Sequence, residues 1–126
     1  METEELITKI IHCAYSVHKA LPPGYYERIY HRALMIELDE QNLKAESEVW
    51  FDANYKGKTI GRFRTDIVVE KCVILELKAI ENILPLNGVQ LVNYLNMTGI
   101  DNGLIINFGS PKLQIERKFR LRNTTD

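Results

Sequence analysis

Several features that mark membrane, secreted or disulfide-bonded proteins are missing from this sequence of 126 residues. No apolar run approaches the roughly 20 residues that a membrane-spanning helix needs. The opening segment METEELITKI has no basic region followed by an apolar region, so we expect no secretion signal. The two cysteines, Cys13 and Cys72, lie far apart and form no CxxC motif. We therefore expect a cytoplasmic protein with free thiols and no membrane contact.

An excess of positive charge is missing as well. The formal net charge is −1 at pH 7, so no global field attracts nucleic acid. This balance argues mildly against a protein that coats DNA, but it does not exclude an enzyme that contacts nucleic acid locally. Apolar residues make up 45% and charged residues 26% of the chain, as in globular domains. We expect residues 1–126 to form a single domain, because no repeat or linker interrupts them.

Hydrophobic periodicity predicts helices and strands in a mixed order. Apolar residues at helical spacing predict three helices, over about residues 6–21, 27–43 and 89–97. Alternating or continuous apolar stretches predict five strands, over about residues 48–55, 59–70, 73–79, 103–108 and 113–121. The order helix, helix, three strands, helix, two strands predicts an α/β fold, with a mixed central sheet of about four to five strands flanked by helices.

The segment VILELKA (73–79) carries charge on an otherwise apolar strand. Strand side chains alternate between faces, so Glu76 and Lys78 point the same way. If residues 70–72 form the hairpin loop, Asp66 faces Glu76, and Cβ atoms of such pairs lie about 4.5–5.5 Å apart. Two carboxylates this close repel unless a cation lies between them, and Mg²⁺ prefers carboxylate and water oxygens. A solvated charged face is the alternative, and a register slip of one residue would separate the pair.

Three short motifs strengthen the metal-site interpretation. GYYERIY (24–30) contains Gly-x-x-Glu-x-x-Tyr, RTDIVV precedes VILELKA, and QLVNY (90–94) contains Gln-x-x-x-Tyr. Each motif alone is weak, but three in this order on a helix, a hairpin and a helix are specific. On these residues the chain resembles the PD-(D/E)xK nuclease superfamily, with Thr65 in place of the nominal proline. Within it, the chain is similar to the GxxExxY proteins and the RecB-like nucleases, over nearly its whole length.

The resemblance implies a restriction-endonuclease-like core and a Mg²⁺-dependent phosphodiesterase, with Mn²⁺ as a substitute and DNA rather than RNA as the expected substrate. Asp66 and Glu76 would bind the metal, with the carbonyl of Leu77 as a third ligand. Glu27 would reach the metal directly or through water, and Lys78 would be the catalytic lysine. An ammonium group at this point would position or deprotonate the attacking water, or stabilise charge on the phosphate.

The resemblance also implies roles for residues on the helices, each with a plainer alternative. Gln90 and Tyr94, spaced i and i+4 on one helix face, would support the site or contact the phosphate backbone, although ordinary surface positions have the same spacing. Tyr30 would flank Glu27, but tyrosines at such positions more often pack in the core. Glu27 itself is also a typical first-turn acid, favoured by the helix dipole. We expect Trp50 to pack rather than to stack on a base.

The segment KLQIERKFRLR (112–122) is locally basic. Lys118, Arg120 and Arg122 alternate onto one face of the expected last strand, and such a stripe would bind phosphates. A sheet edge protected against aggregation by positive charge is the alternative.

Three functions therefore remain open from the sequence: a nuclease, a catalytically silent binding module, and an accessory subunit whose target is chosen by a partner. The complete set of Asp, Glu-x-Lys and Gln-x-x-x-Tyr favours a nuclease, because a binding module needs no such set. The near-neutral charge and the small size favour a catalytically silent module with the nuclease fold that binds nucleic acid or a protein partner. The fold by itself cannot select the substrate, and the oligomeric state does not follow from the sequence.

Overall fold

The structure is a computed structural model that describes residues 1–121. Within these residues, helices and strands follow one another in the predicted order. They are α1 (Thr3–Ala20), α2 (Glu27–Glu40), β1 (Ala45–Tyr55), β2 (Lys58–Val69), β3 (Val73–Lys78), α3 (Pro85–Thr98), β4 (Asn102–Asn107) and β5 (Gln114–Phe119). No helix in this part of the chain combines the length and the apolar character needed to cross a membrane.

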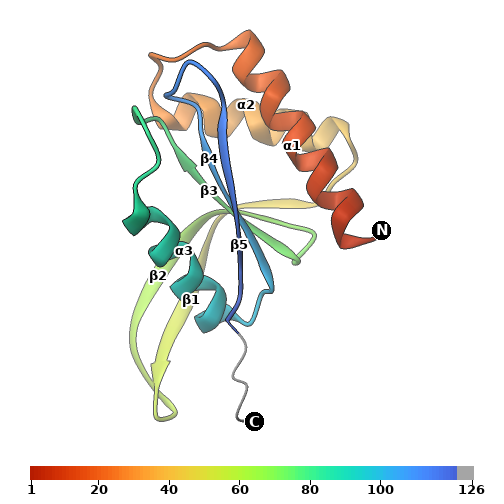
Figure 1. Ribbon diagram of the computed structural model, residues 1–126. Coiled ribbons are helices and arrows are strands. Elements are labelled where there is room, and N and C mark those ends of the chain that lie inside the picture. The colour runs from red at the N-terminus through yellow and green to blue at the C-terminus, as the bar shows by residue number, and fades with distance from the viewer. Residues whose placement is uncertain (122–126) are drawn as a thin grey trace.

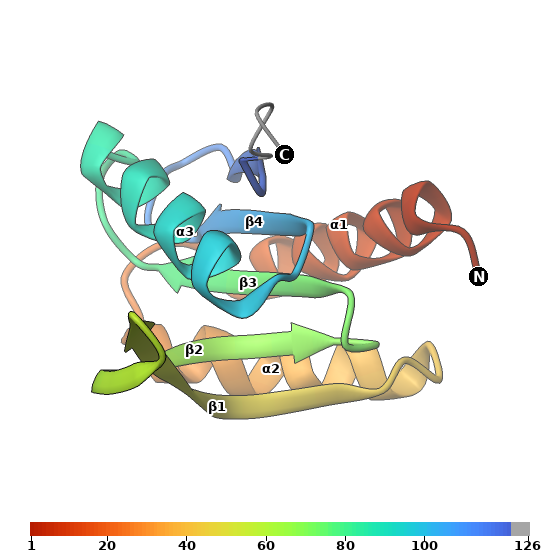
Figure 2. The same ribbon diagram turned by 90° about the horizontal axis from the view of Figure 1, so that it is seen from below.

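The strands form one mixed sheet in the order β1-β2-β3-β4-β5. Neighbouring strands are antiparallel except β3 and β4, which are parallel. A parallel pair needs a crossover connection, and α3 lies on the connection between β3 and β4. α1 and α2 pack on one face of the sheet and α3 on the other (Figures 1 and 2). The predicted α/β class with a mixed sheet flanked by helices is confirmed.

The larger hydrophobic core lies between the sheet and helices α1 and α2. α1 contributes apolar residues at helical spacing, among them Ile10 and Ala14, and neither has exposed surface. Leu34 of α2 and Leu75 of β3 are fully buried in the same core. Burying one leucine side chain contributes about 1.5–3 kcal/mol, so this face of the sheet provides a large share of the stability.

A smaller core lies between the sheet and α3. Its buried members are Val68, Ile74, Leu91, Leu95 and Ile105. Asp66 lies two residues before Val68 on β2. On β3, Glu76 and Lys78 follow Ile74 at the alternating spacing of a strand. Along these two strands the side covered by α3 therefore changes from apolar packing to charged residues.

The helix α3 begins about one turn earlier than the apolar pattern predicts. Pro85 occupies its first turn, where the fixed φ of proline suits a helix and the missing N–H has no helical partner to lose. Asn87 Oδ1 accepts a hydrogen bond of 2.8 Å from the Leu84 N–H at the helix start. Gly99 ends the helix with a φ of 79°, as predicted. The proline therefore starts the helix instead of belonging to the preceding loop.

Candidate active site

The β2–β3 hairpin has the register that the sequence predicts. Its loop consists of residues 70–72, and Ile67 pairs with Leu75. If the same register is extended by one residue pair beyond Ile67 and Leu75, Asp66 lies opposite Glu76. The negative charge of Asp66 contributes to raising the pKa of Glu76, as expected for two carboxyl groups on the same side of the hairpin. The structure therefore brings the two predicted carboxylates together.

The Asp66 side chain ends the ladder between β2 and β3. The backbone pairing stops at Ile67, and the Leu77 N–H donates a hydrogen bond of 2.7 Å to Asp66 Oδ2 instead of to a strand carbonyl. A hydrogen bond from a backbone N–H to a carboxylate is stronger than one between neutral groups. Asp66 is thereby fixed against β3 at the point where β2 separates from it.

Glu76 is a buried acid with an unsatisfied oxygen. Its exposed fraction is 9%, and its Oε1 atom has no hydrogen-bond partner among residues 1–121. Burial, followed by the charge of Asp66, raises the pKa of Glu76 to about 8, although a backbone hydrogen bond with Asp66 and the charge of Lys78 counteract this shift. Ionising a buried carboxyl group that has one oxygen without a partner is costly, so the local chemistry suits a bound cation.

Glu27 approaches this pair from a different layer of the fold. It is the first residue of α2 and is open to solvent on one side. Desolvation by the surrounding protein, followed by the charge of Asp66, raises its pKa, while Lys78 and Arg64 lower it. The start of α2 is therefore within electrostatic range of Asp66, but among the described residues Glu27 does not form a metal-holding group of three with Asp66 and Glu76, and its role as a ligand stays a prediction.

Tyr30 fixes the loop that leads to Glu27. It is fully buried, and its ring stacks on Phe108 with centroids 4.9 Å apart and an interplanar angle of 3°. Its hydroxyl donates a hydrogen bond of 2.7 Å to the Pro22 carbonyl and accepts one of 3.2 Å from the Tyr25 N–H. Tyr30 is thus a core residue, as the plainer interpretation of the motif predicted, and it also positions the start of α2.

Asn107 is a structural residue near the site that the sequence reasoning missed. It pairs with Lys78 across β3 and β4 and is fully buried. Its Oδ1 accepts hydrogen bonds of 3.0 Å from the N–H groups of Ile80 and Gly109. Asn107 therefore fixes the backbone directly after Lys78. A polar residue near the end of the apolar strand GLIINF is the sequence signal that could have identified it.

The two predicted α3 residues differ in their placement. Burial, followed by the charges of Glu76 and Asp66, raises the pKa of Tyr94, so its hydroxyl lies near the acidic pair. The ring of Tyr94 stacks on Phe63 of β2 with centroids 4.4 Å apart. Gln90 is exposed, and no side-chain hydrogen bond of Gln90 occurs within residues 1–121. A role for Gln90 in the site therefore stays a prediction.

The arrangement of ligands restricts the kind of metal that fits. Within the described residues, no group of three or more His, Cys, Asp or Glu side chains is placed to hold a metal ion. Mg²⁺ is commonly bound by one or two carboxylates together with several waters, and Asp66 and Glu76 supply such a pair. Structural Zn²⁺ sites use four protein ligands, usually Cys and His, which do not gather here. The unpartnered Glu76 Oε1 is the observation that best fits a hard divalent cation.

The predicted basic stripe is wrong in one respect. β5 ends one residue before Arg120, so this side chain is not on the strand, and Arg122 lies outside the described residues. Arg120 Nε donates a hydrogen bond of 2.8 Å to Asp101 Oδ1, and Lys118 Nζ lies 3.8 Å from Glu116. The Arg120 N–H also donates a hydrogen bond of 2.9 Å to the Asp101 carbonyl, which is the next pair of the β4–β5 register, so both its backbone and its side chain are bound to Asp101 where the strand ends. Since β5 is an edge strand, these charges agree with the alternative of a protected sheet edge.

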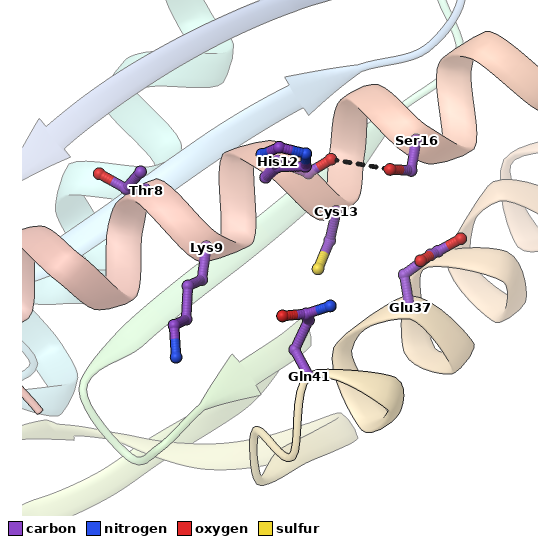
Figure 3. A pocket seen from close by; sticks show the side chains of 7 residues that line it. All are labelled: Thr8, Lys9, His12, Cys13, Ser16, Glu37 and Gln41. Atoms are coloured by element: carbon purple, nitrogen blue, oxygen red, sulfur yellow. Dashed lines mark hydrogen bonds between the residues drawn. The ribbon is translucent and has the colours of Figure 1, made fainter.

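A hollow between α1 and α2 shares no residue with the acidic pair (Figure 3). It is lined by Thr8, Lys9, His12, Cys13, Ser16, Glu37 and Gln41. Burial raises the pKa of the Cys13 thiol to about 11, so this cysteine is protonated at neutral pH. A thiol in this state is a poor nucleophile and a poor metal ligand, so the hollow does not compete with the carboxylates as a reaction site.

Comparisons with known proteins agree with the fold. A family model described as "PD-(D/E)XK nuclease superfamily" matches residues 4–118. No curated protein matches the chain. The crystal structure of SSO0001 is similar, with a TM-score of 0.59 and 22% sequence identity, and the match covers 78% of this chain and 52% of that chain. This chain thus spans about half the length of SSO0001, and at this identity the similarity shows the fold alone.

Proposed function

Because the chain belongs to the PD-(D/E)XK nuclease superfamily, we propose that it is a metal-dependent nuclease that hydrolyses phosphodiester bonds, in DNA rather than in RNA. The observation that carries the proposal is the buried Glu76, whose Oε1 has no partner among residues 1–121 and whose pKa is raised by the nearby charge of Asp66. Such a pair is costly unless a cation balances it. Mg²⁺ is the proposed cation, with Mn²⁺ as a substitute.

Four groups of the chain would hold the ion. They are the carboxylates of Asp66 and Glu76, the carbonyl of Leu77, and Glu27 directly or through water. The 2.7 Å hydrogen bond from the Leu77 N–H already orients Asp66, and the electrostatic contact of Glu27 with Asp66 supports a common site. A divalent ion bound there supplies a Lewis acid that polarises the phosphate and lowers the pKa of a bound water.

Other residues would act directly on the substrate. Lys78 lies on the same side of β3 as Glu76, and its ammonium group would position or deprotonate the attacking water and stabilise charge on the phosphate. The backbone after Lys78 is held by Asn107, so the lysine extends from a rigid strand end. Tyr94, and Gln90 one turn before it on α3, would support the site or contact the phosphate backbone.

Within the superfamily, we place the chain among the GxxExxY proteins, with RecB-like features, and we propose that it acts as a single nuclease domain. The first assignment rests on Gly24, Glu27 and Tyr30, which form the motif in the sequence. It is supported by the observation that Tyr30 holds the loop before Glu27. The RecB-like features rest on Gln90 and Tyr94.

The second candidate is a catalytically silent module that binds nucleic acid or a protein partner. The net charge of −1 favours it, since a nuclease must bind a polyanion. The ion pairs of Lys118 with Glu116 and of Arg120 with Asp101 favour it further, because they reduce the positive charge available for phosphates.

A cleavage assay with matched variants separates the two candidates. The protein is incubated with single-stranded, duplex and RNA substrates in Mg²⁺ or Mn²⁺. We expect cleavage by the wild type, background levels for Glu76→Ala, and wild-type rates for Glu81→Ala, a nearby exposed glutamate. Full activity of Glu76→Ala would contradict the proposed site. Absence of cleavage by the folded wild type on every substrate would favour the silent module.

A further inference from the structure

The β1–β2 hairpin projects from the rest of the sheet (Figure 1). Its exposed side chains include aromatic and basic residues. Trp50, the single tryptophan of the chain, has an exposed fraction of 53%, so the expectation that it packs in the core is wrong. The guanidinium group of Arg62 lies 5.1 Å from the centre of its ring. Arg64 is the partner of Trp50 in the β1–β2 register. The indole is thus about half exposed, with the Arg62 guanidinium group over one of its faces.

A local bend in β1 explains why this tryptophan is outside the core. Glu48 has a φ of 55°, a left-handed conformation that is rare for a residue with a side chain. Before the bend, Ala45 packs with the α1–α2 core, whereas Val49 and Phe51 after it pack with the α3 core. Trp50 lies between Val49 and Phe51 in sequence and so points away from α3. Non-glycine residues in this conformation tend to occur at functional sites.

The exposed surface lies next to the proposed active site. Arg64, the register partner of Trp50, is two residues before Asp66 on β2, or about 7 Å along a strand. Arg64 also lowers the pKa of Glu27, so this part of the hairpin lies near the start of α2. Because Trp50 points away from α3 and the acidic pair lies on the side that α3 covers, a nucleic-acid strand that contacts both would have to pass around the hairpin beside Arg64 and the start of α2.

The charges around Trp50 favour stacking over a purely electrostatic contact. Arg62 lies 3.6 Å from Asp52 and Arg64 lies 3.7 Å from Glu48, so both cations are partly neutralised. Duplex DNA is bound mainly by unpaired positive charge on its phosphates, and its bases show no free faces. Single strands do show free bases, and stacking on an aromatic residue binds them with little dependence on sequence.

We propose that Trp50, flanked by Arg62 and Arg64, is a stacking surface for a base of a single-stranded substrate whose phosphodiester lies at Asp66 and Glu76. The proposal rests on the proposed nuclease function and specifies its substrate as single-stranded nucleic acid. Arg62 lies over one face of the ring in a cation–π contact, and a base would stack on the other face. Arg64 pairs with Trp50 in the β1–β2 register and precedes Asp66 by two residues, so the part of its charge that Glu48 does not neutralise would attract the connecting phosphate.

The single tryptophan allows a direct binding test that needs no catalysis. Intrinsic fluorescence is recorded while oligothymidylate or oligouridylate of about 12 nucleotides is added in EDTA, which prevents cleavage. We expect saturable quenching by the single strands and much weaker quenching by a duplex of the same length. The deoxy and ribo oligonucleotides together show whether the surface distinguishes DNA from RNA.

Variants then connect the fluorescence signal to affinity. Anisotropy of a labelled oligonucleotide should show a loss of about 5- to 100-fold for Trp50→Ala, the range expected for one stacked base, and a smaller loss for Trp50→Phe. Tyr55→Ala is the matched control, because Tyr55 is an exposed aromatic beside Lys56 at the hairpin end. We expect its affinity to stay within about two-fold of the wild type.

The outcomes distinguish this proposal from the nuclease proposal. If oligonucleotides quench the Trp50 fluorescence in EDTA but are not cleaved in Mg²⁺ or Mn²⁺, the result would support the stacking surface and contradict the nuclease activity. If Trp50→Ala binds and cleaves oligonucleotides as the wild type does, the result would contradict the stacking surface and support the nuclease activity. Equal affinity for duplex and single strands, or no binding of any oligonucleotide by the folded protein, would also overturn the stacking surface.

Discussion

Alternate residues of β3 point into two environments that differ sharply in polarity. Leu75 and Leu77 face α1 and α2 in the larger core and have no exposed surface. Ile74 packs under α3, and the next residues on that side are Glu76 and Lys78. The same six-residue strand thus contributes apolar packing on one side and the candidate active site on the other.

The difference shows how a small domain can tolerate a buried acid. Each buried leucine on the α1–α2 side contributes about 1.5–3 kcal/mol, whereas a buried polar group without a partner costs about 1–3 kcal/mol in proteins. Packing on the α1–α2 side can therefore offset the free-energy cost of burying Glu76. The smaller core under α3 would offset that cost less well on its own. If the α1–α2 side mainly provides stability and the α3 side mainly provides activity, substitutions on the first side should lower the free energy of unfolding. Substitutions on the second side should reduce metal binding and cleavage.

The largest effect is expected for Asp66→Asn. The amide oxygen can still accept the hydrogen bond from the Leu77 N–H, so the fold should persist, but one anionic ligand is lost. Mg²⁺ affinity, measured by calorimetric titration, and cleavage should be lost together, with cleavage at background.

The contrasting variant is Leu75→Ala on the other side, which should lower the free energy of unfolding by about 2–5 kcal/mol. Loss of stability in Asp66→Asn equal to that in Leu75→Ala would contradict this division of stability and activity between the two sides.

The next largest effect is expected for Lys78→Met, which separates binding from chemistry. The variant removes no metal ligand and deletes a positive charge near the acidic pair, so metal affinity should be unchanged or slightly higher. Cleavage should fall by about 10²- to 10⁴-fold, the range for a positioned proton-transfer group. Calorimetry and turnover on the same substrate check both values. Equal losses of metal binding in Lys78→Met and Asp66→Asn would mean that Lys78 maintains the site rather than taking part in the reaction.

A third effect concerns pH and stability in the metal-free protein. The pKa of Glu76 is about 8 in the folded state against an ordinary value of 4.5. Between these values the folded protein retains a proton that the unfolded chain has lost, so the free energy of unfolding should decrease as pH rises through this window. Glu76→Gln cannot titrate, and it should be more stable than the wild type near pH 8 by an amount on the order of a few kcal/mol.

Urea unfolding in EDTA at about pH 5 and about pH 8 measures this difference. Glu81→Gln is the control, since this glutamate is exposed and should leave the pH dependence unchanged. A wild-type stability that rises with pH, or a decrease that persists fully in Glu76→Gln, would show that Glu76 is charged and balanced within the protein.

The hairpin geometry was predictable from the sequence because it is local. The loop of residues 70–72 lies between two apolar runs, and side chains alternate strictly along a strand. These two facts place Asp66 opposite Glu76 once the loop length is known. Tyr94 was predictable for a similar reason, since helix periodicity determines its face once the helix start is approximately right.

Features that depend on distant contacts or on unusual backbone were not predictable. Asn107 supports the end of β3 only because β4 lies beside it in parallel, and α3 separates the two strands in sequence. The exposure of Trp50 depends on the left-handed Glu48, and no sequence rule assigns that conformation to a glutamate. The pairing of Arg120 with Asp101 is of the same kind, because Asp101 lies on the connection between α3 and β4, far from Arg120 in sequence.

The smallest effect is expected for Tyr30→Phe, which tests whether a residue of the α1–α2 core positions an acid of the candidate active site. Tyr30 is buried in the α1–α2 core, yet its hydroxyl holds the loop that leads to Glu27. Removing the hydroxyl leaves the stacking on Phe108 in place and breaks its hydrogen bonds to Pro22 and Tyr25, so the unfolding free energy should fall by about 1 kcal/mol.

If the hydroxyl also positions Glu27, cleavage should decrease several-fold while Mg²⁺ affinity falls by less, because Asp66 and Glu76 are fixed by the hairpin. The matched comparison is Tyr25→Phe, whose ring lies 6.1 Å from that of Tyr30 but whose hydroxyl makes no hydrogen bond within residues 1–121. Identical small losses of activity in both variants would assign the effect to general stability. A loss confined to Tyr30→Phe would show that a residue of the stabilising core sets the position of an acid on the catalytic side.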